Sequence, residues 1–136
     1  MLNKMPQSLL IIPVLFLTLM VENPAWGEWT KVGKNKMGDF YVDFDRIKKH
    51  QGYVYFWWMS DYLKPAQSGN MSLSSYQQGD CELFRFKGLN WRGYKESMGS
   101  GFSTSDNVPH KNWIYPDPGS AYELILKSAC NYVKNR

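Results

Sequence analysis

The segment from Arg85 to Lys95, which reads RFKGLNWRGYK, interleaves cationic and aromatic side chains. Guanidinium and ammonium groups bind phosphate and sulfate groups through charge-assisted hydrogen bonds. In an extended strand, Arg85 and Lys87 would share one face and the neighbouring phenylalanines would take the other. We predict that four side chains contribute to a site for an acidic partner: Arg85, Lys87, Arg92 and Lys95. The alternative is that these charges only keep an edge strand soluble.

The two cysteines, Cys81 and Cys130, can pair in only one way. An export signal, described below, favours pairing because exported chains meet an oxidising compartment. No Cys-x-x-Cys motif indicates redox chemistry, and the two thiols with His50 and His110 lack the spacing of a zinc site. We predict a structural disulfide that closes a loop of about 50 residues and stabilises the fold by about 4 kcal/mol.

Catalytic and metal-binding patterns are sparse in this sequence. His50 and His110 could act as bases, but isolated histidines in turns and loops are typical of a surface. No Gly-x-Ser-x-Gly elbow surrounds any serine. Asp43-x-Asp45 lacks the further acidic residues of a calcium loop and is interpreted as a helix cap, and Met98–Gly101 as a turn. The sequence therefore predicts no enzyme, no bound metal and no cofactor.

The N-terminus has the order of regions found in a secretory signal peptide. Lys4 precedes an apolar stretch from Leu9 to Val21, and Ala25-Trp26-Gly27 follows as a small-residue cleavage site. The stretch is shorter than the roughly 20 residues that cross a bilayer. An uncleaved anchor is the alternative. We predict a signal peptide at residues 1–27 and a folded domain at residues 28–136, without a lipid-accepting cysteine at the cleavage site and without a membrane span once the signal is removed.

Composition limits the function of such a domain. With 43% hydrophobic and 21% charged residues, the chain is typical of a globular protein rather than a disordered one. The net charge of +4 permits contact with an acidic partner. Export argues against a nucleic-acid partner, and the short chain leaves no room for a separate cofactor domain.

Alternating hydrophobic patterns predict strands along most of the domain. We expect them at Trp29–Val32, Asp39–Val42, Tyr53–Tyr62, Met71–Cys81, Phe84–Tyr94 and, at an edge, near Phe102–Ser105. A single helical turn at Phe44–Lys49 is expected after the Asp43 cap. Tyr53–Tyr62 is apolar on both faces and is placed in the middle of the sheet. In the strand Phe84–Tyr94 the aromatic phase slips at Gly88, which predicts a β-bulge there.

A C-terminal helix is predicted by the Ser120-x-x-Glu123 capping box. Behind the cap, apolar residues recur at helical spacing: Tyr122, Ile125, Leu126, Ala129 and Val133. Cys130 lies on the same stripe, so a bridge to Cys81 would fasten the helix to a sheet face. The predicted fold is α+β, a single antiparallel sheet of about five to six strands with one C-terminal α-helix packed on one face.

The sequence resembles the bacterial surface-adhesin protein E family. The resemblance rests on the order of several short motifs: Trp29-x-Lys31-Val32-Gly33, Tyr41-x-Asp43, Ser60-Asp61-Tyr62, Asp80-Cys81, Tyr94-Lys95-Glu96 with Met98-Gly99-x-Gly101, Trp113, Pro116 and the helix ending in Cys130. It implies a sheet whose C-terminal helix is tied by the disulfide. It also implies a surface-exposed protein of Gram-negative bacteria that binds host matrix or serum components.

Together these features predict an exported, non-enzymatic envelope protein that works as a binding module. The expected partner is an extracellular protein or an acidic polysaccharide, and self-association is left open. The alternative is a periplasmic structural or assembly protein without a host ligand.

Overall fold

The structure is a computed structural model that describes residues 28–136, so the predicted signal peptide at residues 1–27 lies outside the described residues. The described part forms seven strands, two 3-10 helices and one α-helix. The strands are β1 (Thr30–Asn35), β2 (Gly38–Val42), β3 (Lys48–His50), β4 (Tyr53–Tyr62), β5 (Ser72–Asp80), β6 (Arg85–Tyr94) and β7 (Ser103–Asp106). The helices are η1 (Phe44–Arg46), η2 (Ser97–Gly99) and α1 (Ala121–Lys134).

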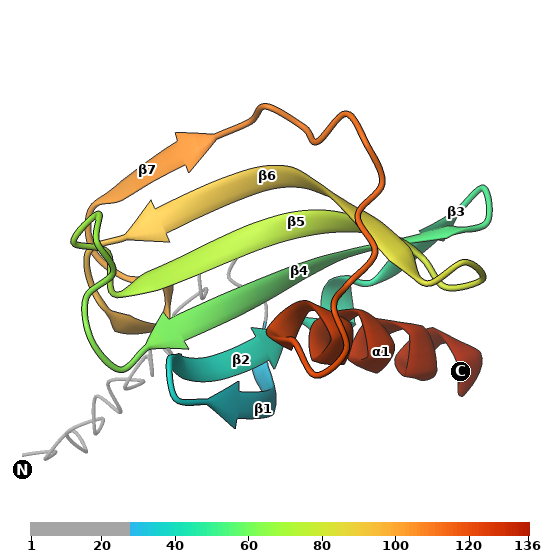
Figure 1. Ribbon diagram of the computed structural model, residues 1–136, viewed down its shortest axis with the longest axis horizontal. Coiled ribbons are helices and arrows are strands. Elements are labelled where there is room, and N and C mark those ends of the chain that lie inside the picture. Colours follow the sequence, from blue (N-terminus) through green and yellow to red (C-terminus); the bar gives the residue numbers. More distant parts are fainter. Residues whose placement is uncertain (1–27) are drawn as a thin grey trace, which may run out of the picture.

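All strands belong to one antiparallel sheet with the order β1-β2-β4-β5-β6-β7, and β3 pairs with the start of β4 (Figure 1). β4 has the predicted bounds and lies in the interior of the sheet, between β2 and β5. The predicted edge strand is present as β7. The α+β fold with a single antiparallel sheet and one C-terminal helix is therefore confirmed.

The segment after Asp43 differs from the prediction. The Asp43 carboxylate accepts a hydrogen bond from the Asp45 N–H, as expected of a cap, but the 3-10 turn ends at Arg46. The chain then forms β3, which pairs with β4 around Gln51 and Gly52. Both residues have positive φ, 49° and 83°, as in the tight two-residue turns whose twist matches a hairpin. Lys48 and Lys49, which were predicted to end the helical turn, therefore lie in strand β3.

The predicted irregularity in β6 is confirmed. Tyr76 pairs with Asn90 and Gln77 with Gly88, so Leu89 is the extra residue of a bulge. The bulge brings Trp91 onto the same face of the sheet as Gly88. A Cβ on Gly88 would lie 2.3 Å from the Trp91 ring, so glycine makes this close approach feasible.

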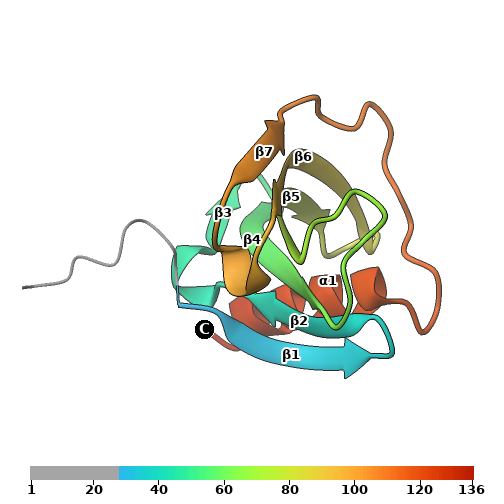
Figure 2. The ribbon, with the colours of Figure 1, turned by 90° about the vertical axis from the view of Figure 1, so that its left-hand side faces the viewer.

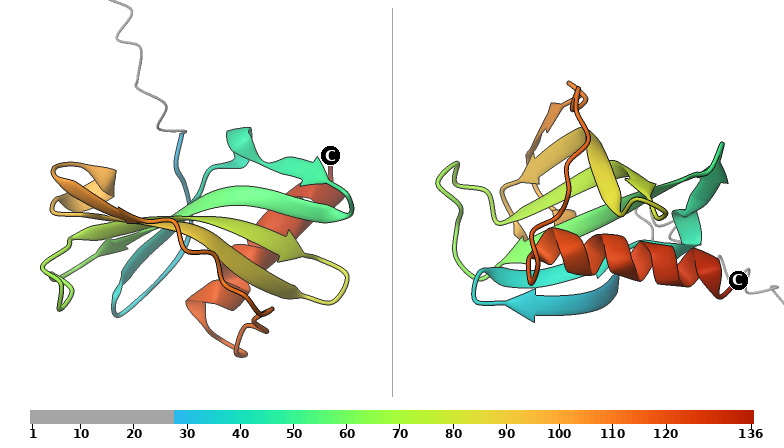
Figure 3. Two further views of the ribbon diagram at one scale, coloured as in Figure 1. Left: turned by 90° about the horizontal axis from the view of Figure 1, so that it is seen from above. Right: turned by 45° about the vertical axis from the view of Figure 1, so that its right-hand side comes forward.

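Helix α1 crosses one face of the twisted sheet and contacts β1, β2 and β4 (Figures 2 and 3). Its cap is the predicted one, because Ser120 Oγ accepts from the Glu123 N–H at 3.2 Å. Four of the five predicted stripe residues are buried, while Tyr122 is 40% exposed and packs against Phe86 and Trp58. The core lies between this stripe and the inward side chains of β2, β4 and β6.

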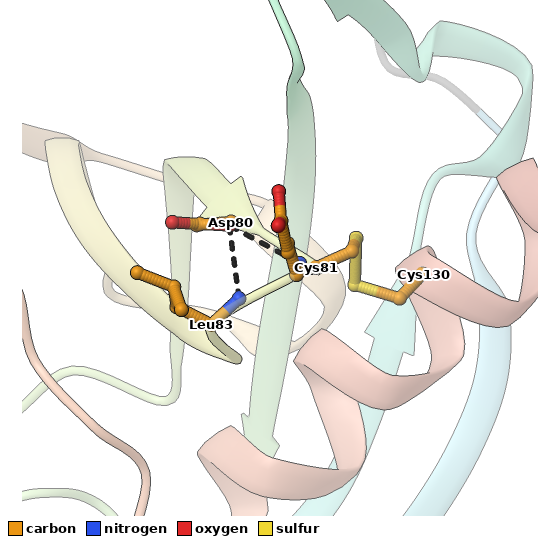
Figure 4. The surroundings of a disulfide bond; sticks show 5 residues. Asp80, Cys81, Leu83 and Cys130 are labelled. Carbon is orange, nitrogen blue, oxygen red and sulfur yellow. Dashed lines mark hydrogen bonds between the residues drawn. A yellow bond between two sulfur atoms is a disulfide. The ribbon is translucent and has the colours of Figure 1, made fainter.

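The disulfide between Cys81 and Cys130 is present, with Cα atoms 5.7 Å apart (Figure 4). Cys81 follows the last residue of β5, and Cys130 lies in the C-terminal half of α1. The bond therefore fastens the turn between β5 and β6 to the helix, as predicted. No helix among residues 28–136 is long and apolar enough to cross a bilayer.

Candidate binding face

The sheet face opposite α1, called the outer face below, carries a cluster of aromatic rings. Side chains alternate along β4, so Val54, Phe56 and Trp58 face the helix while Tyr53, Tyr55 and Trp57 face outward. The strand register aligns Tyr76 of β5 with Trp57. Ring centroids are 5.1 Å apart for Trp57 and Tyr76 and 6.2 Å apart for Tyr55 and Tyr76. The four outward rings are half-buried rather than covered.

A fifth ring reaches the outer face from the connection between β7 and α1. Ile114 and Phe86 exchange two backbone hydrogen bonds of 2.9 Å, which hold this connection alongside the start of β6. The preceding residue, Trp113, then lies over the outer face, with its ring 5.3 Å from that of Tyr53. Trp113 is half-buried, so part of its side chain remains exposed to solvent.

His110 holds the same connection in place further along β6. Its backbone N–H donates to the Gly88 carbonyl at 2.9 Å, and its Nδ1 accepts from the Gly88 N–H at 3.0 Å. The ring also packs on Trp91, with centroids 4.6 Å apart. His110 is thus engaged in fixing the loop that carries Trp113.

An ion pair places a guanidinium on the Trp113 ring. Asp80, which is 5% exposed, accepts from Arg85 Nε through Oδ2 at 2.9 Å. The Arg85 guanidinium lies 4.4 Å from the Trp113 centroid, and Lys87 Nζ lies 4.7 Å from it. Both distances are within the range of cation–π attraction. The two cations and the indole thus form one contact group on the outer face.

The Asp80 carboxylate also shapes the turn after β5. Its Oδ1 accepts from the N–H groups of Glu82 and Leu83 at 3.1 and 3.2 Å (Figure 4). Burial raises the pKa of the Asp80 carboxyl, but the hydrogen bonds from Leu83 and Arg85 and the Arg85 charge outweigh burial and lower that pKa below its ordinary value. The carboxylate therefore stays charged and keeps Arg85 in place.

A second group on the outer face again combines a buried aspartate, an arginine and a tryptophan. Asp43 is fully buried and pairs with Arg46 through its Oδ2. The Arg46 guanidinium lies 5.7 Å from the Trp57 centroid. Two buried aspartates therefore each hold an arginine against a tryptophan, and both tryptophans belong to the aromatic cluster.

The four residues predicted from sequence do not all lie together. Arg85, Lys87 and Arg92 share the outer face, because the bulge at Leu89 shifts the alternation by one residue. Lys95 lies beyond the end of β6, and its ammonium donates to the Ser68 carbonyl at 3.0 Å in the loop between β4 and β5. The structure thus places three of the four on the outer face, with Arg85 and Lys87 together at Trp113 and Arg92 further along β6, and it places the fourth beyond the end of the strand.

Sequence reasoning missed the aromatic half of this face. From the sequence, Trp113 appears only as part of the family resemblance, and Tyr53–Tyr62 is placed in the middle of the sheet as a strand that is apolar on both faces. The available signal was that all three odd residues from Tyr53 to Trp57 are aromatic, while only one helix exists to cover the sheet.

Among the described residues, no group of three or more histidine, cysteine or acidic side chains is arranged to hold a metal ion.

The family model for surface-adhesin protein E matches residues 29–131. The chain belongs to the surface-adhesin protein E family. Among solved structures, crystal form II of Haemophilus influenzae protein E is similar with a TM-score of 0.59 and 18% identity, covering 77% of this chain and 89% of that chain. A second structure of Haemophilus influenzae protein E has a TM-score of 0.58 and 18% identity, covering 78% and 86%. No curated protein matches the chain.

The residues matched by the family model cover the main elements of the fold. The surface-adhesin protein E match spans the sheet and continues through Cys130, so it includes the disulfide and most of α1. At 18% identity, the two solved structures support the fold alone.

Proposed function

We propose that this protein is an exported, non-enzymatic binding protein of the bacterial surface, and that its outer face binds a host extracellular protein or acidic polysaccharide. Membership of the surface-adhesin protein E family supports the adhesive role. The observation that carries the proposal is the cluster of five half-buried rings with arginines held against two of them. Tryptophan, tyrosine and arginine are the residues that contribute most to binding energy at protein interfaces.

The basic side chains of the outer face favour a negatively charged partner. Lys87 and Arg92 lie on the outer face, and Arg92 is exposed. Arg85 is different, because the buried Asp80 depends on it for charge compensation. Replacing Arg85 would therefore disturb the fold as well as binding, whereas Lys87 and Arg92 report on binding.

The test compares the double variant Lys87→Gln, Arg92→Gln with the wild type. Binding to purified matrix proteins and to immobilised heparin is measured at low and high salt by surface plasmon resonance. We expect the variant to bind about tenfold more weakly, equivalent to about 1.4 kcal/mol. Wild-type binding should fall as salt rises, because exposed charges are screened over about 8 Å at physiological salt.

A matched control removes the same charge elsewhere. Lys34 and Lys36 are exposed on and beside the edge strand β1, so Lys34→Gln, Lys36→Gln should bind like the wild type. Equal binding by wild type and the outer-face variant would exclude these cations from the site. Absence of binding by every variant would favour a periplasmic structural or assembly role instead.

A further inference from the structure

A cavity of about 690 Å³ lies away from the centre of the outer face, where three segments of the chain converge. Its walls come from the hairpin between β3 and β4 (residues 49–54), the turn between β5 and β6 (residues 81–84) and the last turns of α1 (residues 127–134). The disulfide joins the second wall to the third. This volume is within the range of about 300–1,000 Å³ that is typical of small-molecule sites.

The interior of this cavity, called the helix pocket below, is apolar. Val54 and Val133 line it and are 4% and 7% exposed. Phe84 and the half-buried disulfide complete the apolar lining. An apolar chain placed here would remove these surfaces from water, which is favourable in proportion to the area covered.

The rim of the helix pocket is cationic. Three exposed lysines line it, Lys49, Lys127 and Lys134, and they face one carboxylate, that of Glu82. The difference is two positive charges (3 − 1), with His50 as an additional donor. Lys49 comes from the hairpin and the other two lysines from α1, so the positive charges are supplied by two separate elements.

Backbone geometry also distinguishes the helix pocket. Among the described residues, three non-glycine residues have positive φ, and two of them, Gln51 and Phe84, line this cavity. A left-handed conformation is costly for a bulky side chain such as phenylalanine. The Asp80 carboxylate supports it through the N–H groups of Glu82 and Leu83, and such strain clusters at ligand sites.

We propose that the helix pocket binds a single-chain anionic amphiphile, a free carboxylate with an apolar tail. The tail lies against Val54, Phe84 and Val133, and the carboxylate lies among the rim lysines. The charge difference disfavours a cationic amphiphile, and the apolar lining disfavours a small hydrophilic anion. This site is independent of the proposed function, which uses the outer face.

The direct test uses dodecanoate below its micellar concentration as the probe. Isothermal titration calorimetry should detect one molecule per chain, and dodecyltrimethylammonium should bind at least about tenfold more weakly. Backbone amide chemical-shift changes should concentrate at residues 49–54, 81–84 and 127–134. Absence of dodecanoate binding, or equal binding of the cationic analogue, would overturn the proposal.

Two variants test the two halves of the helix pocket. Asn131 is an exposed lining residue, so Asn131→Trp should fill the pocket without altering the core and should abolish binding. Lys127→Gln, Lys134→Gln should weaken dodecanoate binding about tenfold, whereas Lys34→Gln, Lys36→Gln should not. Unchanged affinity in both pocket variants would place the ligand elsewhere. Association with anionic phospholipid vesicles without binding of free dodecanoate would refute the proposal in favour of a membrane surface.

Discussion

At the level of single residues, Asp80 has two structural roles on the outer face. One carboxylate oxygen fixes the turn after β5, and the other holds Arg85 against Trp113. The sequence predicted that Arg85 and Lys87 share a face. It did not predict that Arg85 is paired, because an ion pair between residues five apart depends on how the intervening turn folds.

Replacing Asp80 with asparagine should lower the free energy of unfolding by about 1.5–3 kcal/mol, the range for hydrogen bonds that involve a charged group. The amide keeps the side-chain volume but removes the charge that compensates Arg85. Urea unfolding at pH 7 measures the change. Asp45→Asn is the control, because Asp45 is exposed and should change stability by no more than about 0.5 kcal/mol.

The same residue predicts a pH dependence. The pKa of Asp80 is lowered in the folded protein, whereas an aspartate in the unfolded chain has a pKa of about 3.9. The ionised carboxylate therefore contributes its full stabilisation above about pH 4, and this is lost as the pH falls through the lower folded pKa. Urea midpoints of wild type and Asp80→Asn should accordingly converge as the pH falls below about 4. A difference that stays constant as the pH falls would contradict the assignment.

At the scale of elements, the sequence predicted most strands and the helix, but not where each face would be covered. The pattern of Tyr53–Tyr62 gave the bounds of β4, and the glycine in β6 indicated the bulge. The outward aromatic residues of β4 were not recognised as an open surface, because hydrophobic patterning cannot show that only one helix is available to cover the sheet. β3 was missed, since Lys48–His50 has no alternation and depends on the turn at Gln51 and Gly52.

The disulfide joins the turn between β5 and β6 to α1, and its contribution to stability can be measured directly. Replacing Cys81 and Cys130 by serine should lower the free energy of unfolding by about 2–5 kcal/mol. The protection of amide hydrogens from exchange should fall most in the C-terminal half of α1 and in the turn at residues 81–84. In the wild type, titration of the unfolded and unreduced protein should find no free thiol, and two thiols per chain would contradict the bond.

At the scale of the whole molecule, the outer face and the helix pocket meet at Tyr53, whose ring packs on Trp113 and whose backbone belongs to the hairpin that lines the pocket. Their cations nevertheless come from different elements, β6 and η1 for the outer face and mainly α1 for the pocket. Sequence alone indicated the cationic part of the outer face, but neither its aromatic part nor the helix pocket, because these combine segments that are distant in the chain.

Because the charges of the two sites come from different elements, we predict that each site can be disabled without the other. Lys87→Gln, Arg92→Gln should bind dodecanoate with wild-type affinity while losing matrix or heparin binding. Lys127→Gln, Lys134→Gln should show the reverse pattern. Measuring both ligands on both variants forms a complete cross-comparison. If either variant lost both activities while its thermal midpoint stayed unchanged, the two surfaces would be one site.

The two edge strands of the sheet, β1 and β7, affect whether copies of this protein associate edge to edge at high concentration. β7 consists of Ser103–Asp106, all exposed and without an apolar side chain, and β1 carries Lys31 and Lys34 on its exposed positions. Polar and lysine-rich edges resist the addition of a further strand from another molecule. Neighbouring copies of the protein are therefore disfavoured from joining edge to edge into an aggregated sheet.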